Sequence, residues 1–537
     1  MSPSHARSVL LAAMCTALLA LAPSAFGAAQ VRTGSGAATA SGKDPFVVTH
    51  DGAVRGVAVP GGYAFRGLPY AAAPTGELRW RPPRRPASWS GIRDATHYGP
   101  SCPQKPSLFQ PPGLQSEDCL YLNVSTSTLR RDAKRPVLVW IHGGGFTQDG
   151  ALNYDGSKLA ADGIVVVTIN YRLGALGFLA HPALASRPGG PAGNYGLMDQ
   201  QAALRWVRHE IARFGGDPHN VTIAGQSAGG VSVLAQLVSR GARGLFQRAI
   251  VASGAFALTQ VPLADAEAFG KTFAGAVDCQ DQTAECLREV PVDTLVNTFP
   301  GAAIPGVIDG KVLTQSIGTA LAAGHFARVP IVNGVNHDEE LIFVAGLQLA
   351  VSGGMFVPAP EPDAASYESV IASVLGVSAS RASAIAAEYP LAAYPAPVLA
   401  LSTLVADANF ACPALQVDRW TSARVPTFAY QFDDDTAPQI FAGPHFPPIA
   451  THSSEIQYLL DQPNAPFAAP LDAVQETLAA SMRRAWANFA ANGDPAAAAV
   501  PWPSFNTSSD VLSLVSPQPQ VESNFASVHH CALWGAG

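Results

Sequence analysis

Four short runs of apolar and β-branched residues most constrain the fold of this chain. Each is four to six residues long, as buried strands are, and the runs are Val137–Ile141, Ile164–Ile169, Val221–Ala224 and Ile331–Val335. Between the second and third runs, Leu197–Phe214 has apolar residues at helical spacing and ends at a Gly-Gly-Asp-Pro stop. Strands that alternate with helices predict an α/β fold, with a mostly parallel sheet and helices on both faces.

The third run leads into a Gly-x-Ser-x-Gly pattern centred on Ser227. Gly225 and Gly229 allow a strand, a tight turn and a helix to pass closely, which is the setting of a nucleophile elbow. Because glycine supplies 49 of 537 residues, such a pattern also arises by chance. A structural strand-to-helix turn is therefore the alternative, and other parts of the chain must decide between the two.

A glycine-rich loop, His-Gly-Gly-Gly-Phe, directly follows the first run. The amides of Gly143, Gly144 and Gly145 carry no side chains that would keep a substrate oxygen away. Two of these amides, with the amide of Ala228 after the serine, would hold the oxyanion of a tetrahedral intermediate. The pattern favours an oxyanion hole over a merely flexible loop.

A serine nucleophile needs a histidine base, which follows the serine in α/β-hydrolases. Six histidines do so, namely His325, His337, His445, His452, His529 and His530. His452 lies in a predicted loop that enters a helix, although Ser454 and Glu455 there could equally cap that helix. The pattern does not exclude His445.

The acid that orients the base is expected after the fourth run. Asp338, Glu339 and Glu340 follow that strand directly, and open α/β sheets place functional groups at the carboxyl ends of their strands. Spacing alone does not choose among the three carboxylates.

The N-terminus predicts export. Arg7 precedes an apolar run and small residues of the kind that flank a cleavage site, so we expect a signal peptide over residues 1–29. Residues 30–43 are rich in small residues and predict a flexible leader, followed by a single domain over 44–537. No other apolar run is long enough to span a membrane, so a secreted or periplasmic protein without a transmembrane anchor is expected.

Cysteine usage agrees with export. Beyond Cys15 in the signal peptide, the six cysteines are Cys102, Cys119, Cys279, Cys286, Cys412 and Cys531, an even number that predicts three disulfides among fifteen pairings. None has zinc-finger spacing, so no metal site is expected. The net charge is −7 with no basic block, so no nucleic-acid partner is expected.

Longer motifs carry a resemblance to a known family. In order along the chain they are YAFRGLPYAAAPTGELRWRPP (63–83), SEDCLYLNV (116–124), NYRLGALGFL (170–179), GNYGLMDQQAALRWV (193–207) and FGGDPHNVTIAGQSAGG (214–230). With these motifs the chain resembles the type-B carboxylesterases, the α/β-hydrolase group of bacterial esterases, liver-type carboxylesterases and cholinesterases. The closing HHCALW is similar to that of bacterial members. The resemblance spans nearly the whole predicted mature chain and implies the α/β-hydrolase fold, with loop and helical insertions around the active site.

The resemblance also implies a role for each candidate. The family's nucleophile, acid and base match Ser227, Glu339 and His452, and its oxyanion donors match Gly144, Gly145 and Ala228. Its disulfides match Cys102–Cys119 and Cys279–Cys286, which leaves Cys412–Cys531 as the third pair. It implies no metal or organic cofactor.

Some residues depart from the family pattern. Gln226 stands where the family has glutamate. Glu340 replaces the glycine that follows the acid in the family, and Ser453 replaces the glycine that follows the histidine. The segment between Cys102 and Cys119 has no tryptophan and one aromatic residue, Phe109. Cholinesterases bind choline with a tryptophan in that segment by cation–π attraction, so a choline ester is not expected as substrate.

The resulting hypothesis is a serine hydrolase that cleaves carboxylic esters through an acyl-enzyme on Ser227. A lactonase, carbamate hydrolase or amidase with the same site, or a non-catalytic binding member of the family, are the alternatives. Phe256 and the Pro-rich loop near Phe356 are candidates for the substrate pocket, and a core role for Phe256 is equally compatible with the sequence. Sequence patterns do not set the oligomeric state.

Overall fold

A computed structural model describes residues 44–107, 109, 111–185, 190, 192–300, 306–344, 363–441, 447–496, 500–506 and 509–535. The predicted signal peptide (1–29), the predicted leader (30–43), His445 and the loop around Phe356 lie outside the described residues.

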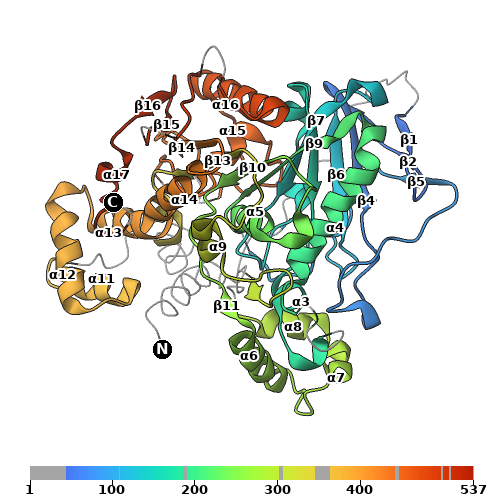
Figure 1. The fold of residues 1–537 in the computed structure, drawn as a ribbon, viewed down its shortest axis with the longest axis horizontal. Helices are drawn as coiled ribbons and strands as arrows, with labels where there is room; N and C mark the ends of the chain where they lie inside the picture. Colours follow the sequence, from blue (N-terminus) through green and yellow to red (C-terminus); the bar gives the residue numbers. More distant parts are fainter. Residues whose placement is uncertain are drawn as a thin grey trace.

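A mixed sheet, eleven-stranded in the described chain, forms the centre of the fold (Figure 1). Neighbouring strands run parallel from β15 to β8, and antiparallel strands extend the sheet at both edges. In sheet order the strands are β16 (Gln520–Glu522), β15 (Val511–Leu514), β14 (Thr427–Phe432), β13 (Ile331–Asn336), β10 (Arg248–Ala252), β9 (Gly216–Gln226), β7 (Arg135–Ile141), β8 (Val165–Ile169), β6 (Tyr121–Thr126), β4 (Gly62–Pro69) and β3 (Val57–Val59). All four runs singled out in the sequence are strands of the parallel part.

Helices cover both faces of this sheet because alternate residues of each buried strand point to opposite sides. In β7, Val137 and Val139 belong to one hydrophobic core, whereas Leu138 and Trp140 belong to another. The first core includes residues of α4 (Tyr195–Glu210) and α5 (Ala228–Val238), and the second includes residues of α16 (Ala473–Asn492). The predicted α/β architecture is confirmed.

Further helices and short strands surround this framework, and α6, α7, α8 and β11 gather beside α3 in Figure 1. Their bounds are α2 (Ser157–Ala161), α3 (Gly174–Phe178), β11 (Val261–Pro262), α6 (Leu263–Ala276), α7 (Ala284–Glu289), α8 (Val292–Thr298), β12 (Val307–Ile308), α9 (Ile317–Ala323), α15 (Ile456–Leu459) and α17 (Phe525–Val528). The predicted helix over 197–214 is α4 with a 3-10 turn (Ile211–Phe214) that ends at Gly215, whose φ is 84°.

A helical unit lies at one side of the molecule, next to the C-terminal α17 (Figure 1). It comprises α11 (Tyr367–Leu375), α12 (Ala379–Glu388), α13 (Pro397–Ala406), the π-helical turn η8 (Asp407–Ala411) and α14 (Cys412–Ser422). The continuous stretch Pro397–Ser422 is apolar and long enough to cross a membrane, which the search for apolar runs in the sequence missed. Because 72% of its apolar window is buried inside the protein, it packs as a core helix.

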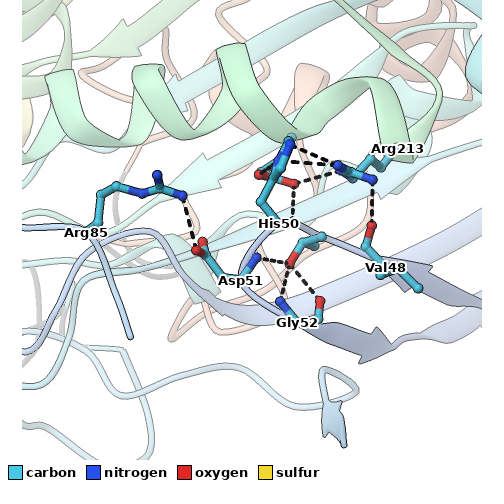
Figure 2. Close-up of polar contacts among 8 residues, drawn as sticks. Val48, His50, Asp51, Gly52, Arg85 and Arg213 are labelled. Atoms are coloured by element: carbon cyan, nitrogen blue, oxygen red, sulfur yellow. Dashed lines mark hydrogen bonds and ion pairs between the residues drawn. The ribbon is translucent and has the colours of Figure 1, made fainter. Parts of the chain in front are cut away.

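A small sheet of β1 (Phe46–Val48), β2 (Ala53–Arg55) and β5 (Ile92–Asp94) lies at the opposite side of the molecule (Figure 1). Figure 2 shows how the β1–β2 turn is held to the end of α4. The buried carboxylate of Glu210 accepts hydrogen bonds from the main-chain amide of His50 at 3.1 Å and its ring Nδ1 at 2.5 Å. Arg213 pairs with the same carboxylate at 3.0 Å and donates to the carbonyl of Val48 at 3.0 Å. Polar contacts centred on the buried carboxylate of Glu210 thus hold the start of the described chain on the main body.

Three disulfides link segments that lie outside the parallel strands. Cys102 is joined to Cys119, Cys279 to Cys286, and Cys412 to Cys531. The third closes a sequence separation of 119 residues and fixes the C-terminal segment to the start of α14.

Candidate active site

Ser227 lies at a sharp turn between β9 and α5. Its backbone has φ 56° and ψ −124°, a conformation that non-glycine residues rarely adopt. A Cβ atom on Gly229 would lie 2.0 Å from the carbonyl oxygen of Ile141, and one on Gly225 would lie 2.5 Å from the carbonyl carbon of Gly229. Glycine is therefore needed on both sides of the serine, and the turn has the geometry of a nucleophile elbow.

The glycine loop that follows β7 lies beside this turn. A Cβ atom on Gly143 would be 3.1 Å from the Cβ of Ser227. Gly144 and Gly145 have φ values of 83° and 60°, so the loop turns in a way that favours glycine. Among the described residues, the amides of Gly144, Gly145 and Ala228 donate no hydrogen bond. These three main-chain N–H groups thus have no hydrogen-bond acceptor within the described part of the chain.

Tyr171 fixes the start of the same loop. Its hydroxyl donates to the carbonyl oxygen of His142 at 2.9 Å, and its ring stacks on the His142 imidazole with centroids 4.4 Å apart. Burial lowers the pKa of His142, which keeps this imidazole uncharged next to the glycines. The contacts of Tyr171 and His142 that hold the start of this loop are therefore made by uncharged groups.

The structure brings Glu339 and His452 together. Nδ1 of His452 lies 2.5 Å from Oε2 of Glu339, and both side chains are buried. The main-chain amide of Asn336 donates to the other oxygen of Glu339 at 2.8 Å. Burial alone lowers the pKa of His452, but the charge and hydrogen bond of Glu339 more than offset it, so the pKa is raised above 6.5.

The other ring nitrogen of His452 has a different partner. Nε2 of Gln226 lies 3.1 Å from Nε2 of His452. No hydrogen bond in the described structure joins Ser227 to His452, and the Ser227 side chain is partly exposed. Catalytic hydrogen bonds often tighten only when substrate binds, so this arrangement is compatible with a serine–histidine pair.

The remaining carboxylates after β13 have other contacts. Asp338 lies 3.2 Å from Nδ1 of His337. Glu340 is buried and accepts a hydrogen bond from Asn409 at 3.2 Å, and burial raises its pKa to about 7. The three acids that spacing could not separate thus differ in environment, and Glu339 contacts His452.

Glu455 is a further buried acid near this pair. Its side chain makes no cap to the α15 helix, in contrast to the alternative that the sequence left open. It accepts a hydrogen bond from Nδ2 of Asn336 at 2.7 Å, and burial and the nearby charge of Glu339 raise its pKa to about 7. Asn336 therefore binds both Glu339 and Glu455, a link that no sequence pattern indicates.

The other described candidate histidines lie elsewhere. His529 contacts Asp407 at 2.5 Å and Gln431 at 2.9 Å, and His530 pairs with Glu388 at 3.2 Å. His325 is exposed and contacts Gln315. In the described ranges no group of three or more His, Cys, Asp or Glu residues is arranged to hold a metal ion.

Two aromatic rings that the sequence did not single out flank the base. The ring centroids of Phe343 and Phe410 lie 5.0 and 5.3 Å from that of His452. Phe410 belongs to the π-helical turn η8, and Phe256 lies 5.2 Å from it. Such turns are often found at functional sites. Phe256, which the sequence suggests for the substrate pocket, is thus separated from His452 by the ring of Phe410.

Comparison with known proteins places this constellation in a family. Residues 43–534 match the model of the carboxylesterase family. A cocaine esterase of Oryctolagus cuniculus is 35% identical over 508 residues, covering 89% of this chain and 93% of that enzyme. A para-nitrobenzyl esterase of Bacillus subtilis (strain 168) is 32% identical over 504 residues, covering 89% and 96%.

Solved structures agree with the sequence relatives. A PNB esterase structure superposes with a TM-score of 0.76 at 30% identity, covering 91% of this chain and 99% of that one. The chain therefore belongs to the carboxylesterase family and has the α/β-hydrolase fold. It is an enzyme of the ester-hydrolase class.

Proposed function

We propose that the chain cleaves small carboxylic esters by two acyl transfers on Ser227. His452 takes the hydroxyl proton through Nε2 as the serine oxygen attacks the ester carbonyl, and Glu339 orients the ring and stabilises the imidazolium. The tetrahedral intermediate then collapses, and His452 gives the proton to the leaving alcohol. Water, deprotonated by the same histidine, attacks the acyl-enzyme and releases the acid.

The amides of Gly144, Gly145 and Ala228 are proposed to hold the oxyanion. Each such donor contributes typically about 3–4 kcal/mol to lowering the barrier. Their freedom from other hydrogen bonds supports this role. The observation that carries the proposal is the buried contact of 2.5 Å between His452 and Glu339, next to a serine at φ 56°.

Labelling with an organophosphonate ester tests the proposal. A single adduct on Ser227, located by intact mass and peptide mapping, is the expected result. Ser227→Ala should keep the fold, take up no label and lose hydrolysis. Wild-type turnover in folded Ser227→Ala, or no adduct on folded wild-type protein, would overturn the proposal and favour a non-catalytic binding protein.

The substrate class within this chemistry is proposed as carboxylic esters, on the strength of the relatives. These include proteins named cocaine esterase, acylcarnitine hydrolase and para-nitrobenzyl esterase. A lactonase, carbamate hydrolase or amidase would use the same residues. A matched panel of ester, lactone, carbamate and anilide substrates separates these, and the ester should have the highest kcat/KM.

The mature enzyme is proposed to be secreted or periplasmic, with one domain over 44–537 after a signal peptide (1–29) and a leader (30–43). The three disulfides support an oxidising compartment. N-terminal sequencing of protein exported from an expressing cell should begin near residue 30. A retained N-terminus would contradict the signal peptide.

A further inference from the structure

The side chain of Gln226 forms a hydrogen bond with Nε2 of His452, the nitrogen that the proposed reaction uses. Its side chain is buried at the end of β9, with Nε2 3.1 Å from Nε2 of His452. Because Nδ1 of the ring faces the Glu339 carboxylate, Nδ1 carries the proton and Nε2 presents a lone pair. The Gln226 amide is therefore the donor, and the neutral form of the base is the acceptor.

The charged groups around His452 have the opposite effect, because they favour the protonated form of the ring. The acids that influence it are Glu339 and Glu340 after β13 and Glu455 three residues along the chain. Tyr430, buried on β14, faces Glu339 and Glu455 and is uncharged, and the rings of Phe343 and Phe410 are neutral. Each carboxylate favours the imidazolium, which cannot accept the serine proton.

We propose, on the basis of the function proposed above, that Gln226 is a positioning residue that maintains His452 as a free base and sets the acidic limit of ester hydrolysis. As a donor it stabilises the lone pair on Nε2. For Nε2 to take the serine proton the amide must turn its N–H away from the lone pair, and the rotated amide can then accept from the protonated Nε2 through Oε1. A neutral side chain therefore serves both protonation states without trapping the imidazolium.

A glutamate at this position would behave differently. Its carboxylate would form an ion pair with the imidazolium about 3 Å away, and it has no hydrogen to donate to the free base. Glutamate is also the residue that the resemblance places here, so the backbone accommodates it. Gln226→Glu is thus the informative variant, and Gln226→Met removes the hydrogen bond without adding charge.

The test is the pH dependence of kcat/KM for a neutral ester and of the rate of phosphonate labelling of Ser227. In Gln226→Glu we expect the midpoint of the acidic limb to rise by about one unit or more. In Gln226→Met a smaller rise is expected, because only the donor is lost. Gln247→Glu is the matched control and should leave the acidic limb unchanged. The side chain of Gln247 accepts a hydrogen bond from the main-chain amide of Val221, at the end of the buried part of β9 that lies away from Gln226.

Titration of His452 by NMR of 15N-histidine-labelled protein gives a reading that does not need activity. A rise of the His452 pKa in Gln226→Glu supports the proposal, and an unchanged pKa and acidic limb in the folded variant overturn it, leaving Gln226 a packing role. A loss of kcat without any shift of the acidic limb would likewise overturn the proposal. Failure of the proposed function is seen separately, as absence of labelling of Ser227 in the wild type.

Discussion

Gly229 approaches Ile141 so closely that a Cβ atom on the glycine would lie 2.0 Å from the Ile141 carbonyl oxygen. This contact sets the spacing between the start of α5, which carries the Ala228 amide, and the end of β7, which leads to the glycine loop. Gly229→Ala should push the two apart and misplace the proposed oxyanion donors. We expect kcat/KM to fall at least about 100-fold, the loss typical of one such donor, and stability to fall by about 1–3 kcal/mol or more.

The matched control is Gly275→Ala. Gly275 lies within α6, where the nearest atoms to an added Cβ are 3.9 Å away. Alanine there should raise the free energy of unfolding by about 0.5–1 kcal/mol with no effect on turnover. Thermal unfolding and steady-state kinetics check both variants. Normal activity in Gly229→Ala would mean that the close contact does not position the proposed oxyanion hole.

The acidic limb of the wild-type rate profile is a separate prediction. The proposed base is active when neutral, so activity falls as the pH drops through the pKa of His452. Because Glu339 holds that pKa above 6.5, we expect the midpoint of kcat/KM above pH 6.5 and about tenfold loss per unit well below it. A flat profile from pH 4 to 8 would exclude a histidine base.

The buried carboxyl group of Glu340 should make the protein less stable as the pH rises. Burial raises its pKa from 4.5 to about 7, so the folded state binds this proton more tightly than the unfolded state. The resulting stabilisation is complete below pH 4.5 and is lost as the pH rises through 7. Glu340→Gln, whose carbonyl can still accept from Asn409, should therefore be more stable than wild type at pH 8, by up to about 3 kcal/mol, and similar at pH 4.

Denaturant unfolding at the two pH values checks this. Glu289→Gln, an exposed site at the end of α7, is the control and should leave the pH dependence unchanged. Equal stability differences at pH 4 and pH 8 would show that Glu340 does not retain its proton near neutral pH.

The disulfides should differ in their effect on stability because they close loops of different length. Cys412–Cys531 has a sequence separation of 119 and Cys279–Cys286 of 7. By chain entropy, removing the first pair should cost about 5 kcal/mol and the second about 2. Double alanine variants, compared by denaturant unfolding, test this. Equal losses would point to native-state contacts rather than loop closure.

Much of the framework follows from local patterns. Buried parallel strands are continuous apolar runs, so β7, β8, β9 and β13 are evident in the sequence. The elbow is evident for a related reason, since Gly225 and Gly229 are required by backbone contacts that only glycine permits. Features that depend on backbone geometry within one segment are thus predictable.

Contacts between distant segments are not predictable in this way. Phe410 reaches His452 from the π-helical turn η8, and Asn336 joins Glu339 to Glu455. No periodicity specifies such pairs, because each partner has an ordinary neighbourhood in the sequence. The sequence leaves the choice among Asp338, Glu339 and Glu340 open for the same reason, and only the family resemblance points to Glu339.

Phe256 supplies a final prediction, about substrate preference. Its half-buried ring lies 5.2 Å from Phe410, whose ring lies 5.3 Å from His452. Phe256→Ala would open space on the far side of Phe410 and should raise kcat/KM for long acyl chains relative to short ones in a series of p-nitrophenyl esters. Phe269→Ala, another half-buried ring but packed on Phe273 and Phe299, should lower stability alone. An unchanged chain-length profile in Phe256→Ala would assign Phe256 to the core.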